Sequence, residues 1–415
     1  MEAHLFGRLI SVAEARRRLW TVVRPIDRIE SVDVGAAFGR VSAAAMRSPI
    51  PVPPFARATW DGYALRSRDV RGASLHRPQP LRVVGEVFAE QAYRGRLGPG
   101  EAVAVATGGA LPAGADAIEI FERVRRRGSV VSVTAPVPRG ARIAPAGDDF
   151  PRGTLLVHPG DVLRPGVIGA LAACGIARLP VYARPRVAVV PNGNELRPPG
   201  SRLRRGEIFE SNNASLSAFL TACGCEPVPL APVRDDPVEI ERALRWAVKE
   251  SDLVLATGGS SVGERDHLAR LFPRIGQLLF HGIAVRPGKP TLAARAGRTI
   301  LLGLPGHPTS CLLNMHWLVM PALRRLARLP GPGWRRRTAR LAGSAASGTS
   351  GFTTVLPLQL HGDRVVPTFR GSSAISSLGG ADAFAMLPPG RATLRKGSRL
   401  GVFVLDPPLG PLGSV

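Results

Sequence analysis

The 415-residue sequence predicts an α/β protein of several domains, and three observations support this fold class. The chain is longer than the ~250–300 residues over which a single hydrophobic core grows. Its hydrophobic fraction of 45% is ordinary for a globular protein. Between residues 184 and 329, short apolar runs alternate with helix-like segments, a pattern typical of a mainly parallel sheet. We therefore expect a three-layer α/β domain accompanied by smaller domains.

The N-terminal part predicts one helix and then an extended path. Ser11 and Glu14 have the spacing of a capping box, so a helix should follow them. The proline-rich passage 49–54 predicts an extended, irregular chain. Residues 1–55 and 147–183 are therefore expected to form an elongated N-terminal domain.

Residues 56–146 change to short β-type runs broken by Gly/Pro turns, which predicts a small inserted β domain. Its expected strands are 81–87, 102–106, 117–121 and 130–133.

The α/β domain, residues 184–329, contains four expected strands at 186–190, 228–231, 253–256 and 299–304. Asp236 followed by Pro237 predicts the N-cap and first residue of a helix. In parallel sheets, ligands bind beyond the carboxyl ends of the strands. Four segments follow these strand ends, and they contain Glu195, Asp235, the glycine turn 258–263 and the loop 305–308.

The C-terminal part, residues 330–415, predicts a small β domain of barrel-like form. Residues 329–340 (LPGPGWRRRTAR) are interpreted as a linker because glycine and proline dominate their first half. The expected strands are 355–360, 364–367, 383–387 and 400–405.

The net charge of +24 comes almost entirely from arginine, which raises the question of a nucleic-acid partner. Arginines cluster only at 16–18, 125–127 and 335–337, and few aromatic residues lie among them. This scatter favours solvated surfaces over a nucleic-acid site.

Membrane and secretory signals are not evident in the sequence. No run approaches the ~20 apolar residues of a membrane helix. Glu2 and His4 interrupt the N-terminal stretch where a secretory signal would lie. Cys174, Cys223, Cys225 and Cys311 lack a paired metal spacing, so we expect buried thiols and a cytoplasmic location.

Carboxylates from separate segments are the candidate metal ligands. They are Asp61, Asp149, Glu195, Asp235 and Asp266. Acids gathered around one pocket repel each other unless a cation neutralises them. Mg²⁺ prefers oxygen ligands and commonly keeps substrate phosphates in its shell. Each acid taken alone is better read as a helix cap or turn residue.

Anion-binding groups are expected beside these acids. The glycine turn would offer backbone N–H donors to a phosphate or another oxyanion. Arg286 and Lys289 flank Gly288 and add two cations. His307 is a candidate ligand or acid, although a lone histidine is more often structural.

Seven motifs in order resemble the molybdopterin molybdenumtransferase family, the molybdenum insertases related to the catalytic end of gephyrin. The motifs are Trp60-Asp-Gly-Tyr-Ala64, Thr107-Gly with Pro112-Ala-Gly-Ala-Asp116, Gly193-Asn-Glu-Leu196, Arg234-Asp-Asp-Pro237, Gly258-Gly-Ser-Ser-Val-Gly263 with Asp266, Arg286-Pro-Gly-Lys-Pro290 and Leu304-Pro-Gly-His-Pro308. The chain departs from the family pattern at Trp60, in place of methionine, and at His307, in place of asparagine. A lysine is also missing at Gly282, and an arginine of the last domain has no counterpart near Phe352.

The resemblance implies an α/β domain of the molybdopterin-binding type and a reaction. The family takes adenylylated molybdopterin and molybdate, cleaves the pyrophosphate with Mg²⁺, and releases AMP and molybdenum cofactor. The implied catalytic acids are Asp61, Glu195, Asp235 and Asp266, which with Asp149 would hold the metal. The implied substrate-binding residues are Thr107, Gly258, Gly259, Ser260, Ser261, Gly263, Arg286, Lys289, Pro305, Gly306, His307, Pro308 and Ser372. The family also implies a homodimer with a cleft shared between subunits.

Other functions stay open at this point. They are a molybdopterin adenylyltransferase-like enzyme or a pyrophosphatase on the same α/β fold, a tungstate-handling paralogue, a nucleic-acid-binding protein and a catalytically weak scaffold.

Overall fold

The computed structural model describes residues 9–258, 267–343, 345–346, 351–390 and 393–405. The chain folds into two compact units. One contains Met1–Glu30, Gly39–Val41 and Tyr182–Val415, and the other contains Ser31–Phe38 and Ser42–Val181.

A six-stranded sheet forms the centre of the first unit. Its order is β16 (Glu226–Pro229), β13 (Arg186–Pro191), β17 (Leu253–Thr257), β21 (Thr299–Leu304), β20 (Leu292–Ala296) and β18 (Gln277–His281). The first four strands are mutually parallel and correspond to the four expected strands. The last two are antiparallel and were not predicted. The α/β fold class is confirmed.

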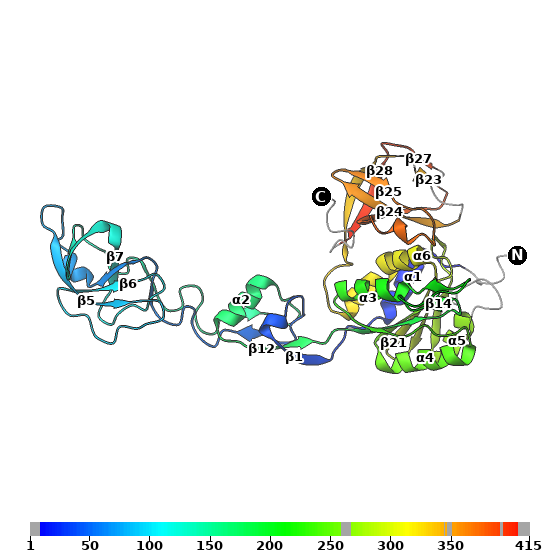
Figure 1. The fold of residues 1–415 in the computed structure, drawn as a ribbon, viewed down its shortest axis with the longest axis horizontal. Coiled ribbons are helices and arrows are strands. Elements are labelled where there is room, and N and C mark those ends of the chain that lie inside the picture. The colour runs from blue at the N-terminus through cyan, green and yellow to red at the C-terminus, as the bar shows by residue number, and fades with distance from the viewer. Residues whose placement is uncertain (1–8, 259–266, 344, 347–350, 391–392, 406–415) are drawn as a thin grey trace. The chain divides into compact units, whose positions relative to one another are not determined.

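Helices cover both faces of this sheet (Figure 1). On one face, α4 (Pro237–Glu250) and α5 (His267–Ile275) pack on alternate residues of the strands. On the other face lie α1 (Val12–Val22), α3 (Asn212–Ala222) and α6 (Pro308–Asn314), followed by η5 (Met315–Val319) and α7 (Met320–Leu326). Adjacent residues of β13 therefore serve two different cores, because successive strand side chains point to opposite faces.

Two helix starts follow the sequence prediction. The Ser11 hydroxyl accepts from the Glu14 amide at 3.1 Å, and α1 begins at the next residue. The Asp236 carboxylate accepts from the amides of Val238 and Glu239, both at 2.9 Å, so Asp236 is the N-cap of α4.

A second sheet forms the C-terminal part of the same unit. Its order is β19 (Val285–Arg286), β24 (Thr353–His361), β25 (Arg364–Pro367), β22 (Trp334–Leu341), β28 (Arg399–Leu405) and β26 (Ala383–Leu387), with a further pairing of β24 and β26. Two short strands, β23 (Ala345–Ala346) and β27 (Thr393–Leu394), pair beside it.

The linker interpretation of residues 329–340 is wrong, because β22 begins at Trp334 and pairs with β28 over seven residues. Four consecutive residues, 335–338, are exposed, so the strand lacks the alternation of buried and exposed positions that sequence reading depends on. Backbone pairing on both sides holds β22, and its arginine side chains extend into solvent.

The second unit contains a six-stranded sheet and several short strand pairs. The sheet order is β7 (Ala117–Ile120), β4 (Gly62–Leu65), β6 (Glu101–Val105), β5 (Gln79–Val87), β9 (Val130–Val133) and β8 (Val124–Arg127). The pairs are β2 (Met46–Arg47) with β11 (Leu155–Val157) and β3 (Arg57–Ala58) with β10 (Ile143–Ala144), and α2 spans Pro165–Ala173. Two strands, β1 (Ile29–Asp33) and β12 (Arg178–Tyr182), pair where the chain passes between the units.

The four cysteines are free and buried, as expected. Burial raises the pKa of the Cys223 thiol to about 12 and that of Cys311 above its ordinary range. Among the helices of the described residues, none has the length and apolar character needed to cross a membrane.

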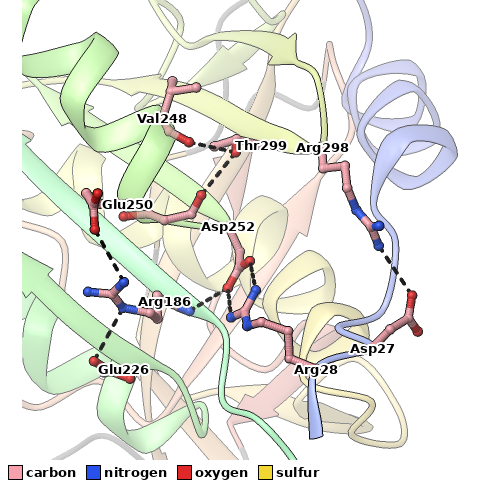
Figure 2. A network of polar contacts seen from close by, with 10 residues as sticks. Asp27, Arg28, Arg186, Glu226, Val248, Glu250, Asp252, Arg298 and Thr299 are labelled. Atoms are coloured by element: carbon pink, nitrogen blue, oxygen red, sulfur yellow. Dashed lines mark hydrogen bonds and ion pairs between the residues drawn. The ribbon is translucent and has the colours of Figure 1, made fainter.

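Asp252, just before β17, ties the sheet to the N-terminal segment (Figure 2). Its carboxylate accepts two bonds from the Arg28 guanidinium, at 2.7 and 2.8 Å, and a third from the Arg186 amide at 2.8 Å. The carboxylate is largely buried, whereas Arg28 is about half exposed. Bidentate pairs of this kind are the stronger class of hydrogen bond.

We expect Asp252→Ala to lower the free energy of unfolding by about 2 kcal/mol, because the Arg186 amide loses its acceptor along with the ion pair. Asp252→Asn should cost only about 1 kcal/mol, since an amide oxygen can still accept from that N–H. Urea denaturation followed by tryptophan fluorescence measures both. Equal losses for the two variants would contradict the role of the backbone bond.

Candidate functional site

Loops that leave the parallel strands meet at one edge of the central sheet. The segments that follow β13 and β16 remain paired. Asn192 forms a parallel β-bridge with Val233, and the Gly193 amide donates to the Val233 carbonyl at 3.0 Å. Beyond β21, the Gly306 carbonyl accepts from the Asn212 side chain at 2.8 Å. The carboxyl ends of these strands therefore place their loops side by side, as the parallel topology predicts.

Gly258 is the point where three of these loops touch. Its φ of +89° lies in the left-handed region, and a Cβ there would fall 2.2 Å from the Asn192 carbonyl oxygen. A Cβ on Gly306 would lie 3.3 Å from the Gly258 Cα. Only glycine permits this backbone approach. Of the predicted glycine turn, Gly259, Ser260, Ser261, Gly263 and the following Asp266 lie outside the described residues.

Two predicted acids, Glu195 and Asp235, are held on adjoining loops by Asn194. The Asn194 amide donates to the Asp235 carboxylate at 3.3 Å, and the Asp235 amide donates to the Asn194 side chain at 3.2 Å. Both acidic residues are exposed. Asp236 is also exposed, but its carboxylate is engaged in capping α4.

A pocket of about 550 Å³ is lined in part by loop 305–308. Its lining includes five predicted substrate residues, namely Arg286, Lys289, Pro305, His307 and Ser372. No acidic residue is among its described lining residues, whereas two are cations. Two cationic side chains on one pocket favour an anion.

The two cations of the pocket come from a tightly supported turn. A Cβ on Gly288, whose φ is +118°, would fall 2.4 Å from the Asn314 side-chain oxygen. The Asn314 amide group donates to the Thr291 hydroxyl at 2.6 Å, and its oxygen accepts from the Trp317 indole at 2.9 Å. The Arg286 guanidinium lies 4.6 Å from the centre of the Phe352 ring. The buried polar contacts of Asn314 therefore hold this turn in place.

The C-terminal part of the chain completes the pocket. The Ser372 hydroxyl lies 3.2 Å from His307 Nδ1. Phe369, Gly371 and Thr354 also line the space. Sequence reading missed these three residues, together with Ser310 of the 305–310 segment. Only Ser310 carried a signal, because it is a hydroxyl residue two positions after the Pro-Gly-His-Pro loop.

The second unit presents its own predicted pair, Asp61 and Thr107. The Asp61 carboxylate accepts from the Thr107 amide at 2.6 Å and from its hydroxyl at 2.8 Å. These bonds, the amide first, hold the pKa of Asp61 below its usual range, so the carboxylate stays ionised. The neighbouring Trp60 is 60% exposed.

The predicted acids are brought together only in part. Asp149 is exposed near the Val52–Phe150 bridge, whereas Asp61 lies beyond the opposite end of the β3–β10 ladder. Within the part of the chain that the structure describes, no group of three or more His, Cys, Asp or Glu side chains could hold a metal ion. At the edge of the central sheet, the structure brings two of the predicted acids, Glu195 and Asp235, onto adjoining loops.

Comparison with known families covers nearly the whole chain. The family described as MoeA N-terminal region (domain I and II) matches residues 10–175. The probable molybdopterin binding domain matches 188–325, and the MoeA C-terminal region (domain IV) matches 338–405.

Individual relatives agree with the family matches. The chain is 33% identical to molybdopterin molybdenumtransferase 2 of Mycobacterium tuberculosis, over 81% of this chain and 84% of the relative. It is 31% identical to the molybdopterin molybdenumtransferase of a Nostoc species, over 80% and 77% of the two chains. A crystal structure of a molybdopterin biosynthesis moea protein from Pyrococcus horikosii has 35% identity and a TM-score of 0.81, covering 96% of this chain and 99% of that one. The chain therefore belongs to the MoeA family of molybdopterin molybdenumtransferases, enzymes of molybdenum cofactor biosynthesis.

Proposed function

We propose that this protein inserts molybdate into adenylylated molybdopterin, cleaving the pyrophosphate with Mg²⁺ and releasing AMP and molybdenum cofactor. One observation carries the proposal. A pocket lined by two cations includes residues of loop 305–308, and two exposed acids lie on adjoining loops that follow neighbouring parallel strands. The reaction requires this pairing, because it joins a free oxyanion to a substrate that carries metal-bound phosphates.

The cationic pocket is proposed to bind the oxyanion. Arg286 and Lys289 supply the charge, and the Ser372 hydroxyl, the Ser310 hydroxyl and the His307 ring offer polar groups in the same space. A tetrahedral dianion in this pocket would meet donors from both the α/β part and the C-terminal part of the chain. Charge-assisted hydrogen bonds of this type are shorter and stronger than neutral ones.

The acidic edge is proposed to hold Mg²⁺. Glu195 and Asp235 fit that ion, because they are exposed oxygen ligands on adjoining loops and Mg²⁺ keeps several waters and substrate oxygens. Asp61, Asp149 and Asp266 are the further carboxylates in the proposed set. When bound, the ion neutralises charge on the scissile phosphoryl group. The backbone at Gly258 and Gly306 is proposed to frame the pterin and its phosphate, with Gly259, Ser260, Ser261, Gly263 and Pro308.

Asp61 and Thr107 belong to the second unit, and we propose that they reach the site of a partner subunit in a homodimer. The two Thr107 bonds keep the Asp61 carboxylate ionised and in one orientation. This suits a metal ligand that one subunit contributes to the site of the other. This arrangement follows from the family resemblance and makes a direct prediction about mixed dimers.

With adenylylated molybdopterin, Mg²⁺ and molybdate, the purified protein should release AMP, measured by chromatography. Asp235→Ala should slow release by about 100-fold or more, because a charge-stabilising ligand is lost. Its neighbour provides the control, since Asp236→Ala should lose about 1 kcal/mol of stability yet keep its activity. AMP release that does not need molybdate would indicate a pyrophosphatase. Adenylylation of free molybdopterin by ATP would indicate an adenylyltransferase. A preference for tungstate would identify a specialised paralogue.

Mixing Asp61→Ala with Asp235→Ala protein tests the shared cleft. If the two acids of one site come from different subunits, each heterodimer regains one intact site, and an equal mixture should recover about a quarter of wild-type activity. Each variant alone should be inactive. An inactive mixture, in which mass spectrometry shows that heterodimers have formed, would place both acids in one chain's site.

Lys289→Gln should weaken molybdate binding by about tenfold, as measured by calorimetry, because the pocket loses one of its two cations. Lys249→Gln is the matched control, since it removes the same charge from an exposed position at the end of α4. If both variants bind molybdate equally well, the oxyanion does not occupy this pocket.

A further inference from the structure

Residues 368–377, named the covering segment, form one wall of the pocket and are bonded to one another. Buried Ser377 organises it, because its hydroxyl accepts from the Arg370 amide at 2.8 Å and its carbonyl accepts from the Thr368 hydroxyl at 2.6 Å. The pocket-lining residues Phe369, Gly371 and Ser372 lie within this segment. The covering segment is therefore placed as one piece.

Thr309 attaches the covering segment to α6. Its hydroxyl donates to the Ala374 carbonyl at 2.7 Å, and its amide donates to the Ser372 carbonyl at 3.1 Å. Amides in the first turn of a helix have no acceptor within the helix. Here the covering segment provides that acceptor, and the Thr309 side chain is fully buried against it.

The attachment also sets the position of His307, two residues earlier. His307 is the N-cap of α6, but its side chain makes no capping bond to the helix. Its Nδ1 instead lies 3.2 Å from the Ser372 hydroxyl. The two bonds of Thr309 and this contact join the same two segments, so Ser372 and His307 face the space that also contains Arg286 and Lys289.

We infer that Thr309 is a positioning residue for oxyanion binding, and this inference rests on the proposed use of the pocket. Thr309 does not line the pocket. It acts through Ser372 and His307, whose placement depends on the covering segment staying on α6. Because binding and attachment are linked, an oxyanion that contacts Ser372 should also hold the segment in place.

The test compares Thr309→Val, which keeps the side-chain shape, with Thr309→Ser, which keeps the hydroxyl. Calorimetry with molybdate should show about tenfold weaker binding for Thr309→Val and nearly wild-type binding for Thr309→Ser. Amide hydrogen exchange should become faster in residues 368–377 of the valine variant without molybdate. In the wild type, saturating molybdate should slow exchange in the same residues.

Thr299→Val is the matched control. The Thr299 hydroxyl is also bonded to backbone carbonyls, those of Val248 at 3.1 Å and Ser251 at 3.0 Å, but it lies at the start of β21, whereas the pocket follows the end of that strand (Figure 2). This variant should lose stability yet keep molybdate affinity. Folded Thr309→Val with wild-type affinity and exchange would overturn the inference. A third outcome is that the wild type does not bind molybdate, although exchange in residues 368–377 is faster in Thr309→Val. In that case Thr309 still positions the covering segment, and the proposed oxyanion site is wrong.

Discussion

The backbone of loop 305–308 is the constraint on which the first unit's site depends. On one side, Gly306 lies against Gly258 and its carbonyl is held by Asn212. On the other side, His307 and Thr309 hold the covering segment. The loop follows β21, whose position is set by parallel pairing with β17. A displacement of this backbone would therefore disturb the contact at Gly258 and the cationic pocket together.

The distribution of charge matters more for this chemistry than the net charge. The chain carries +24, yet Glu195 and Asp235 are two exposed acids on adjoining loops, whereas Arg286 and Lys289 line the pocket. A carboxylate inside the pocket would repel an oxyanion. In the proposed function, this distribution of charge would let an anion and a cation bind at separate sets of ligands.

Features with local signals could be predicted from the sequence. The capping residues Ser11 and Asp236 and the four parallel strands were found, because each depends on neighbouring residues or a short apolar run. Strand β22 was missed, since exposed arginines hide its pairing, and β18 and β20 were missed because their antiparallel return has no strong pattern. Pocket residues such as Thr354 and Phe369 could not be found, because only long-range packing brings them to Arg286.

Supporting residues are harder to recognise than the residues they support. Asn314 ends α6, where asparagine is a poor helix former, and nothing in the sequence assigns it a role. In the structure it is fully buried, and its amide joins the Lys289 turn to Trp317 through Thr291. Thr309 is also a supporting residue, since its hydroxyl donates to the Ala374 carbonyl. Motifs identify groups that face a ligand, whereas the geometry of those groups depends on buried polar contacts that are visible only after folding.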